Sequence, residues 1–77
     1  MTTVYDELAS ALRERLAIIA DEESRRDVNA HVLRLQEVSE RIEALEQQLP
    51  PPVDPQLRHY LQRRSYTKAL EALEARA

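Results

Sequence analysis

A heptad repeat of apolar residues in the middle of this 77-residue chain constrains its fold more than any other feature. From Val28 to Leu49 the apolar side chains recur at alternating spacings of three and four residues, with His31 at one of these positions. Such spacing places the side chains on one face of an α-helix, and neither Gly nor Pro interrupts the segment. We therefore expect a helix that carries an interaction seam along one side, formed by Val28, His31, Leu35, Val38, Ile42, Leu45 and Leu49.

A helix with this seam needs another helix to cover it. A chain of this length rarely gains more than about 3–5 kcal/mol of net stability from its own core. The sequence contains no Cys, so neither a disulfide nor a thiolate metal site can add to that. Val32 widens the apolar face beyond a strict two-stranded pattern, which favours a bundle of three or four helices. We expect a homodimeric helical bundle with a coiled-coil-like central helix, or a seam that docks on a helix of another protein.

Charged residues beside the seam bear on the orientation of such a pair. In a parallel self-pair, Arg41 of one chain meets Glu46 of the other, whereas an antiparallel self-pair brings arginines together. The charges therefore favour parallel pairing if the helix associates directly with itself. Each exposed ion pair of this kind contributes only about 0.5 kcal/mol or less.

The residues before the seam predict a second helix, over about 3–20. Its apolar residues Tyr5, Leu8, Leu12, Leu16 and Ile19 follow helical spacing, and Thr3 with Asp6 has the form of a capping box. The two apolar stripes are out of phase, and residues 21–27 lack any apolar side chain. We therefore expect a turn near 20–24 and a helical hairpin of 3–20 and 24–49. The alternative is one uninterrupted helix from 3 to 49.

Four prolines divide the C-terminal third of the chain from the hairpin. Pro50, Pro51 and Pro52 end the second helix, and the segment 50–55 is predicted to form an elbow. Asp54 and Pro55 have the residue types of an N-cap and a first helical position, so a helix over about 55–76 should follow. A reversal of its apolar face near 64–65 indicates a break into two helices; the alternative is one continuous helix. The fold class is therefore all-α, a single helical domain over 1–77.

The last segment resembles part of a tetratricopeptide repeat. Tyr60 and the run Tyr66-Thr67-Lys68-Ala69-Leu70-Glu71 are similar to the second helix of that family, which often carries Tyr-x-x-Ala. The resemblance covers some 20 residues, and Leu57 and Arg76 depart from the family pattern. Stacked repeats need at least about three units to bury their faces. We therefore take the segment as helix–turn–helix geometry and assign the chain to no family.

The sequence offers little to support catalysis. Without Gly there is no glycine-rich phosphate loop, without Cys there is no thiol nucleophile, and the two histidines lie on different predicted elements. His31 in the seam is either a pH switch or half of a metal site across a dimer axis, or a polar core position that selects helix register. Arg34 and Leu35, the residues three and four positions further on, supply no second metal ligand, so we favour the register role or a simple, partly exposed histidine. We expect no enzyme, no cofactor and no metal.

The charge of the chain is uneven along its length. Residues 1–49 carry six basic and eleven acidic side chains, whereas residues 50–77 carry five basic and three acidic. We call Arg58, Arg63, Arg64 and Lys68 the basic patch; it is a candidate contact for nucleic acid, or for the acidic first half of the same chain or of a partner chain. The chain is acidic overall, with a net charge of −3, which favours a protein partner over nucleic acid. An acidic N-terminus and the lack of a long apolar run predict a cytoplasmic protein that does not associate with a membrane. We thus expect an adaptor or accessory subunit, with a nucleic-acid-binding regulator as the alternative.

Overall fold

The computed structural model describes residues 3–75, and within them every regular element is a helix. Helix α1 (Val4–Ala20) and helix α2 (Val28–Gln47) are joined by a short 3₁₀ turn, η1 (Ser24–Arg26). Helices α3 (Pro55–Gln62) and α4 (Tyr66–Ala75) follow. The predicted all-α fold, a helical hairpin with a C-terminal helix pair, is confirmed. The predicted end of the last helix at residue 76 lies outside the described residues.

Side-chain caps determine where the two hairpin helices begin. The Thr3 hydroxyl accepts a hydrogen bond from the Asp6 amide at 3.1 Å, and the Asp6 carboxylate accepts one from the Thr3 amide, which completes a capping box. Helix α2 begins later than the predicted Ser24, because the Asp27 carboxylate accepts a hydrogen bond from the Ala30 amide and caps the helix there. Residues 21–27 therefore form the end of the hairpin, which we call the tip.

Helix α2 ends at Gln47, three residues before the first proline. Leu49 lies beyond the helix yet is buried in the core, so the chain leaves the helix before the prolines require it. The Asp54 carboxylate then accepts a hydrogen bond from the Gln56 amide and caps α3, with Pro55 as its first residue.

A Schellman motif separates α3 from α4. The Ser65 amide donates to the Tyr60 carbonyl at 2.8 Å, and the Arg64 amide donates to the Leu61 carbonyl at 3.1 Å. Arg64 has a φ of 58°, the left-handed conformation that this motif requires and that glycine usually supplies. The chain therefore turns sharply here, and the two C-terminal helices are separate.

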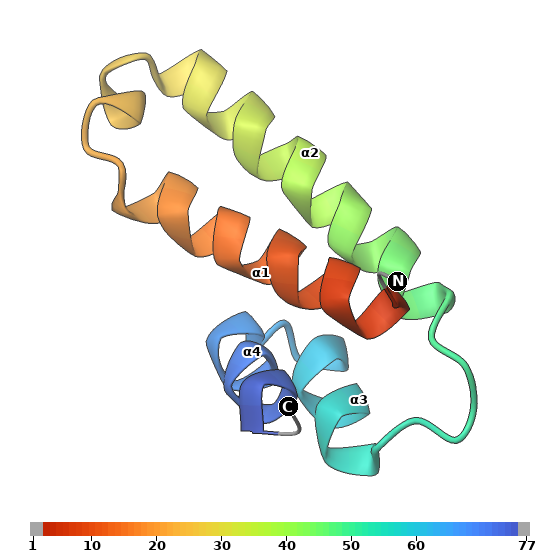
Figure 1. Ribbon diagram of the computed structural model, residues 1–77. Helices are drawn as coiled ribbons and strands as arrows, with labels where there is room; N and C mark the ends of the chain where they lie inside the picture. The colour runs from red at the N-terminus through yellow and green to blue at the C-terminus, as the bar shows by residue number, and fades with distance from the viewer. Residues whose placement is uncertain (1–2, 76–77) are drawn as a thin grey trace.

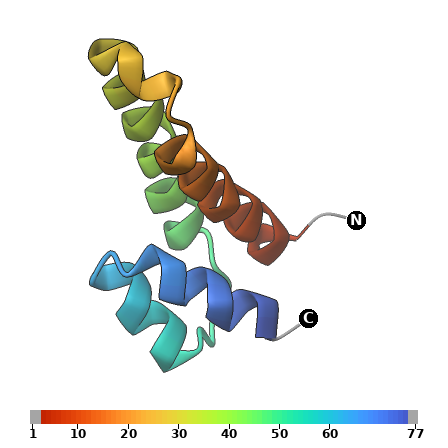
Figure 2. The ribbon, with the colours of Figure 1, turned by 90° about the vertical axis from the view of Figure 1, so that its left-hand side faces the viewer.

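The molecule has the shape of an L (Figure 1). The hairpin is the long arm, and α3 and α4 form a second layer against one of its faces near the open end. Figure 2 shows the tip extending well beyond this second layer. Helices α1 and α2 have 17 and 20 residues, whereas α3 and α4 have 8 and 10, so the helix pair is too short to cover the hairpin.

One apolar core joins the four α-helices. Leu8 and Leu12 of α1, Ile42 of α2 and Leu57 of α3 are the largest fully buried side chains. Leu61 from α3 and Ala69, Leu70 and Leu73 from α4 complete the second layer's contribution. Within residues 3–75, none of the helices is both long enough and apolar enough to cross a bilayer.

Candidate interaction surface

The structure divides the predicted seam into a buried half and an uncovered half. Val38, Ile42, Leu45 and Leu49 are buried in the core of this single chain. His31 and Leu35 are half-buried, and Val28 exposes 66% of its surface. The C-terminal half of α2 thus finds its partners in α1 and the C-terminal helix pair. The N-terminal half does not.

The uncovered part of α2 continues the face that meets the C-terminal helix pair. Glu43, on that face, pairs with Arg64 from the turn between α3 and α4. At about 100° per residue, Val32 lies about 20° around the helix axis from Glu43 and Val28 about 60°, so both share its side of the helix. Leu35 lies about 80° from Glu43, between that side and the core, against which it packs. Val32 exposes 53% of its surface. This face is therefore covered near the open end of the hairpin and uncovered toward the tip.

Helix α1 contributes to the same surface. Arg15 lies over the ring of Tyr66, which begins α4, so this side of α1 faces the second layer. Ile19 follows Arg15 by four residues and lies one turn closer to the tip, beside Leu16; both side chains are half-buried. We call the set Leu16, Ile19, Val28, Val32 and Leu35 the distal apolar surface; Val28 and Val32 are its exposed members, whereas Leu16 and Leu35 also pack against the core.

Sequence reasoning identified Leu16 and Ile19 as part of a helix stripe but did not predict that they border an uncovered surface; both are half-buried, and Leu16 also packs against the core. Helix length could have predicted this surface, because two helices of 8 and 10 residues are too short to cover two helices of 17 and 20 residues. Leu33 is also exposed, at 57%, but it lies about 100° around the helix axis from Val32 and points away from this face.

His31 belongs to a polar network that holds the tip against α2. Its Nδ1 lies 3.1 Å from the Ser24 hydroxyl, and that hydroxyl accepts a hydrogen bond from Arg34 at 2.9 Å. Arg34 also lies 3.7 Å from the Asp21 carboxylate, which in turn accepts hydrogen bonds from the Glu23 and Ser24 amides. The arrangement orders the tip at the edge of the distal apolar surface. Among the described residues, the structure contains no group of three or more His, Cys, Asp or Glu side chains arranged to hold a metal ion.

In a parallel self-pair, Arg41 was expected to meet Glu46 of a second chain. In the structure, Arg41 forms an ion pair with Glu14 of α1 in the same chain. This contact joins α1 and α2 on the side of the hairpin opposite the C-terminal helix pair. The Arg41 charge, on which the expectation of a parallel self-pair depended, is therefore already paired within the chain.

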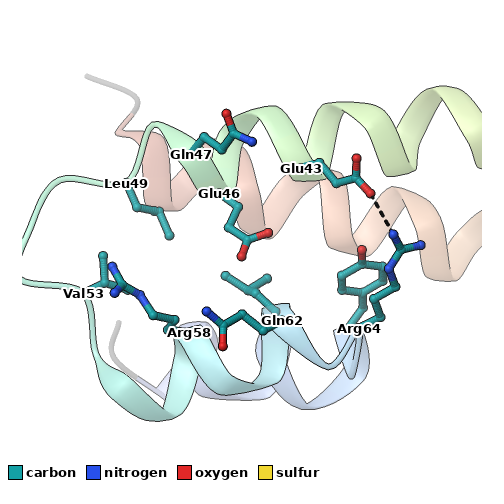
Figure 3. Close-up of a pocket in the computed structure, with 10 residues that line it drawn as sticks. Glu43, Glu46, Gln47, Leu49, Val53, Arg58, Gln62 and Arg64 are labelled. Atoms are coloured by element: carbon teal, nitrogen blue, oxygen red, sulfur yellow. Dashed lines mark hydrogen bonds and ion pairs between the residues drawn. The ribbon is translucent and has the colours of Figure 1, made fainter.

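The four residues of the basic patch are not gathered in one place. Arg58 and Arg64 line a cavity of about 460 Å³ between the end of α2 and α3, together with the acidic Glu43 and Glu46. Figure 3 shows Arg64 joined to Glu43 on one side of this cavity and Arg58 beside Val53 on the other. Lys68 lines a different groove, between α3 and α4, and Arg63 is exposed in the turn between these helices. Two of the four cations therefore face carboxylates across one cavity.

Comparison with known proteins found no match for this chain. The family models, the curated proteins and the solved structures each gave no match.

Proposed function

We propose that this chain is a non-catalytic protein–protein interaction module whose working surface is the distal apolar surface. The observation that carries the proposal is the exposure of Val28 and Val32 on a face that the C-terminal helix pair covers elsewhere. Each of these side chains contributes on the order of 1 kcal/mol when a partner removes it from water. A small chain that leaves such a face open gains stability when another helix covers it.

The partner we propose is a second copy of this chain, which makes the protein a homodimer. Homodimers with two-fold symmetry use the same surface on both copies, so a single apolar surface is sufficient. From Val28 to Leu35, the distal apolar surface has a length of about two turns of α2, enough to form the centre of a contact between neighbouring helices of a bundle. Covering it would complete a bundle in which two hairpins pack face to face.

Protein is favoured over nucleic acid as the partner. A nucleic-acid site needs several cations on one face, free to contact successive phosphates. Arg58 and Arg64 share their cavity with Glu43 and Glu46, and Lys68 lies in another groove. The negative net charge adds a general repulsion from phosphate.

Sedimentation equilibrium tests the proposal. The wild-type chain should approach twice its monomer mass of 8.9 kDa as its concentration rises. Val32→Asp places a charge in the distal apolar surface and should return the chain to a folded monomer. Leu33→Asp is the matched control, because Leu33 is similarly exposed on a different face of the same helix turn; it should remain dimeric. A wild-type chain that stays monomeric at millimolar concentration would refute the proposal.

A further inference from the structure

The tip of the hairpin carries an excess of negative charge. Residues 21–27 contain four acidic and two basic side chains. Asp21 and Asp27 are engaged by backbone amides of the tip and of α2, and Arg25 donates to the carbonyl of Ile19. Glu22 and Glu23 are exposed, and the described part of the chain offers neither of them a cationic side chain within ion-pair distance. The tip therefore presents two free carboxylates to a partner.

The opposite end of the distal apolar surface carries positive charge. The turn between α3 and α4 contains the exposed Arg63 and Arg64. Figure 3 shows Arg64 at the end of the helix pair beyond which α2 continues toward the tip. Arg64 contacts Glu43 at 3.2 Å, yet 72% of its side chain is exposed. Its remaining N–H groups, and the whole Arg63 guanidinium, are open to a second carboxylate.

The distance between these charged ends suits a second hairpin of the same chain. From Val28 to Glu43, which marks the position of the turn on α2, the helix rises about 22 Å. Helices α3 and α4 form a layer one helix thick, and that layer is empty above the distal apolar surface (Figures 1 and 2). A second hairpin is also one helix thick, so its outer half fits into this layer beside the first copy's helix pair.

We propose that two copies associate antiparallel, so that the acidic tip of each copy contacts the basic α3–α4 turn of the other. This inference rests on the self-association proposed above and adds its geometry and a second contact surface. The two-fold axis passes through the distal apolar surface near Val32 and Leu35. The distal apolar surface of each copy covers that of the other. Glu22 and Glu23 of each copy contact Arg63 and Arg64 of the other.

The parallel arrangement of the same two surfaces is disfavoured for two reasons. It would place both C-terminal helix pairs in the same layer at the same end, where they collide. It would also bring the two acidic tips together, and like charges in contact oppose association. The L shape and the charge distribution thus favour the same orientation.

Charge reversal with mixing tests this arrangement. The tip-reversed variant carries Glu22→Arg and Glu23→Arg, and the turn-reversed variant carries Arg63→Glu and Arg64→Glu. Each variant alone should dimerise at least about tenfold more weakly than the wild type, because both of its tip–turn contacts join like charges. In an equimolar mixture, each contact of the heterodimer joins opposite charges, so dimerisation should recover to within about threefold of wild type. Native mass spectrometry counts the heterodimer directly, since the two variants differ in mass.

Controls separate an effect on the contact from an effect on folding. Circular dichroism melts should show both variants folded, since all four residues are exposed. Should the loss of the Arg64–Glu43 contact unfold the turn-reversed variant, Arg63→Glu alone leaves that contact intact and is used in its place. Arg13→Glu makes the same charge change as Arg63→Glu alone, at an exposed position of α1, and should leave dimerisation unchanged. About 0.5 M salt should remove the difference between the variants and the wild type.

The outcomes distinguish the two proposals. Weak association of each variant with recovery in the mixture supports the antiparallel tip–turn contact. Suppose that the wild type dimerises and Val32→Asp dissociates it, but the two charge-reversed variants dimerise as strongly as the wild type, or their mixture dimerises no better than each alone. This result overturns the antiparallel arrangement and leaves the proposed function in place. A monomeric wild type overturns both.

Discussion

The guanidinium of Arg15 lies over the ring of Tyr66, with its central carbon 4.9 Å from the ring centroid. The contact joins the middle of α1 to the first residue of α4, and Tyr66 is itself buried to 6% exposure. A cation held over an aromatic face is attracted by the ring's quadrupole. The Arg15 Nε is buried and has no hydrogen-bond partner in the described part of the chain, so the contact with Tyr66 is the interaction that the structure shows for this guanidinium.

We expect Arg15→Ala to lower the free energy of unfolding by about 0.5–2 kcal/mol, because it removes both the cation and the packing of its stem. Arg13→Ala is the matched control; Arg13 is exposed on the same helix and should change stability by less than about 0.5 kcal/mol. A double-mutant cycle with Tyr66→Leu, measured by urea denaturation, isolates the coupling between the two residues. Additive effects of the two substitutions would contradict a direct interaction.

Tyr66 should make the fold sensitive to alkaline pH. Burial raises the pKa of the Tyr66 phenol above its ordinary value of 10.0, and the nearby Arg64 cation opposes this in part. The unfolded chain therefore loses this proton at lower pH than the folded chain does, so stability falls as pH rises above 10. We expect Tyr66→Phe to lose less stability than the wild type between pH 8 and pH 11 in thermal melts. The comparison at pH 7 gives the effect of the hydroxyl group by itself, and parallel curves for the two proteins would count against the prediction.

Arg64 occupies a backbone position that glycine suits better. Its φ of 58° costs an ordinary L-residue about 1 kcal/mol, and its exposed ion pair with Glu43 returns little. We therefore expect Arg64→Gly to raise the unfolding free energy by about 0.5–1 kcal/mol, while Arg64→Ala lowers it slightly. Arg63→Gly, at a right-handed position with φ of −83°, is the control and should be destabilising. Chemical denaturation of the monomer measures all three. A glycine variant less stable than the wild type would show that the Arg64 side chain contributes more than the backbone preference costs.

Ile42 lies at the centre of the core with no exposed surface. An unpaired carboxylate at this position should cost more than about 4 kcal/mol, comparable to the whole stability expected of a chain this small. We expect Ile42→Asp to abolish the helical circular dichroism signal at 25 °C. Ala44→Asp, two residues away on the exposed side of α2, should leave the signal in place. A helical, cooperatively melting Ile42→Asp chain would mean that the core tolerates charge.

Much of the architecture followed from local chemistry in the sequence. The capping residues Thr3 and Asp54, the stretch without apolar residues at the tip, and Pro55 each determine a helix boundary through interactions within a few residues. The reversal of the apolar face near residue 65 marked the break between α3 and α4. The exact start of α2 did not follow in the same way, because Asp27 competes with Ser24 for the cap.

Only the tertiary structure decided which apolar residues are buried within the single chain and which stay exposed. The heptad spacing treats Val28 and Ile42 alike, since both occupy the same position in the repeat. Their burial differs, 66% exposed against none, because Ile42 lies in the core to which all four helices contribute, whereas Val28 lies beside the tip, beyond the short α3 and α4. Helical periodicity specifies the direction of a side chain around its own axis. Whether another element lies in that direction depends on how far the rest of the chain extends, and that is a property of the assembled fold.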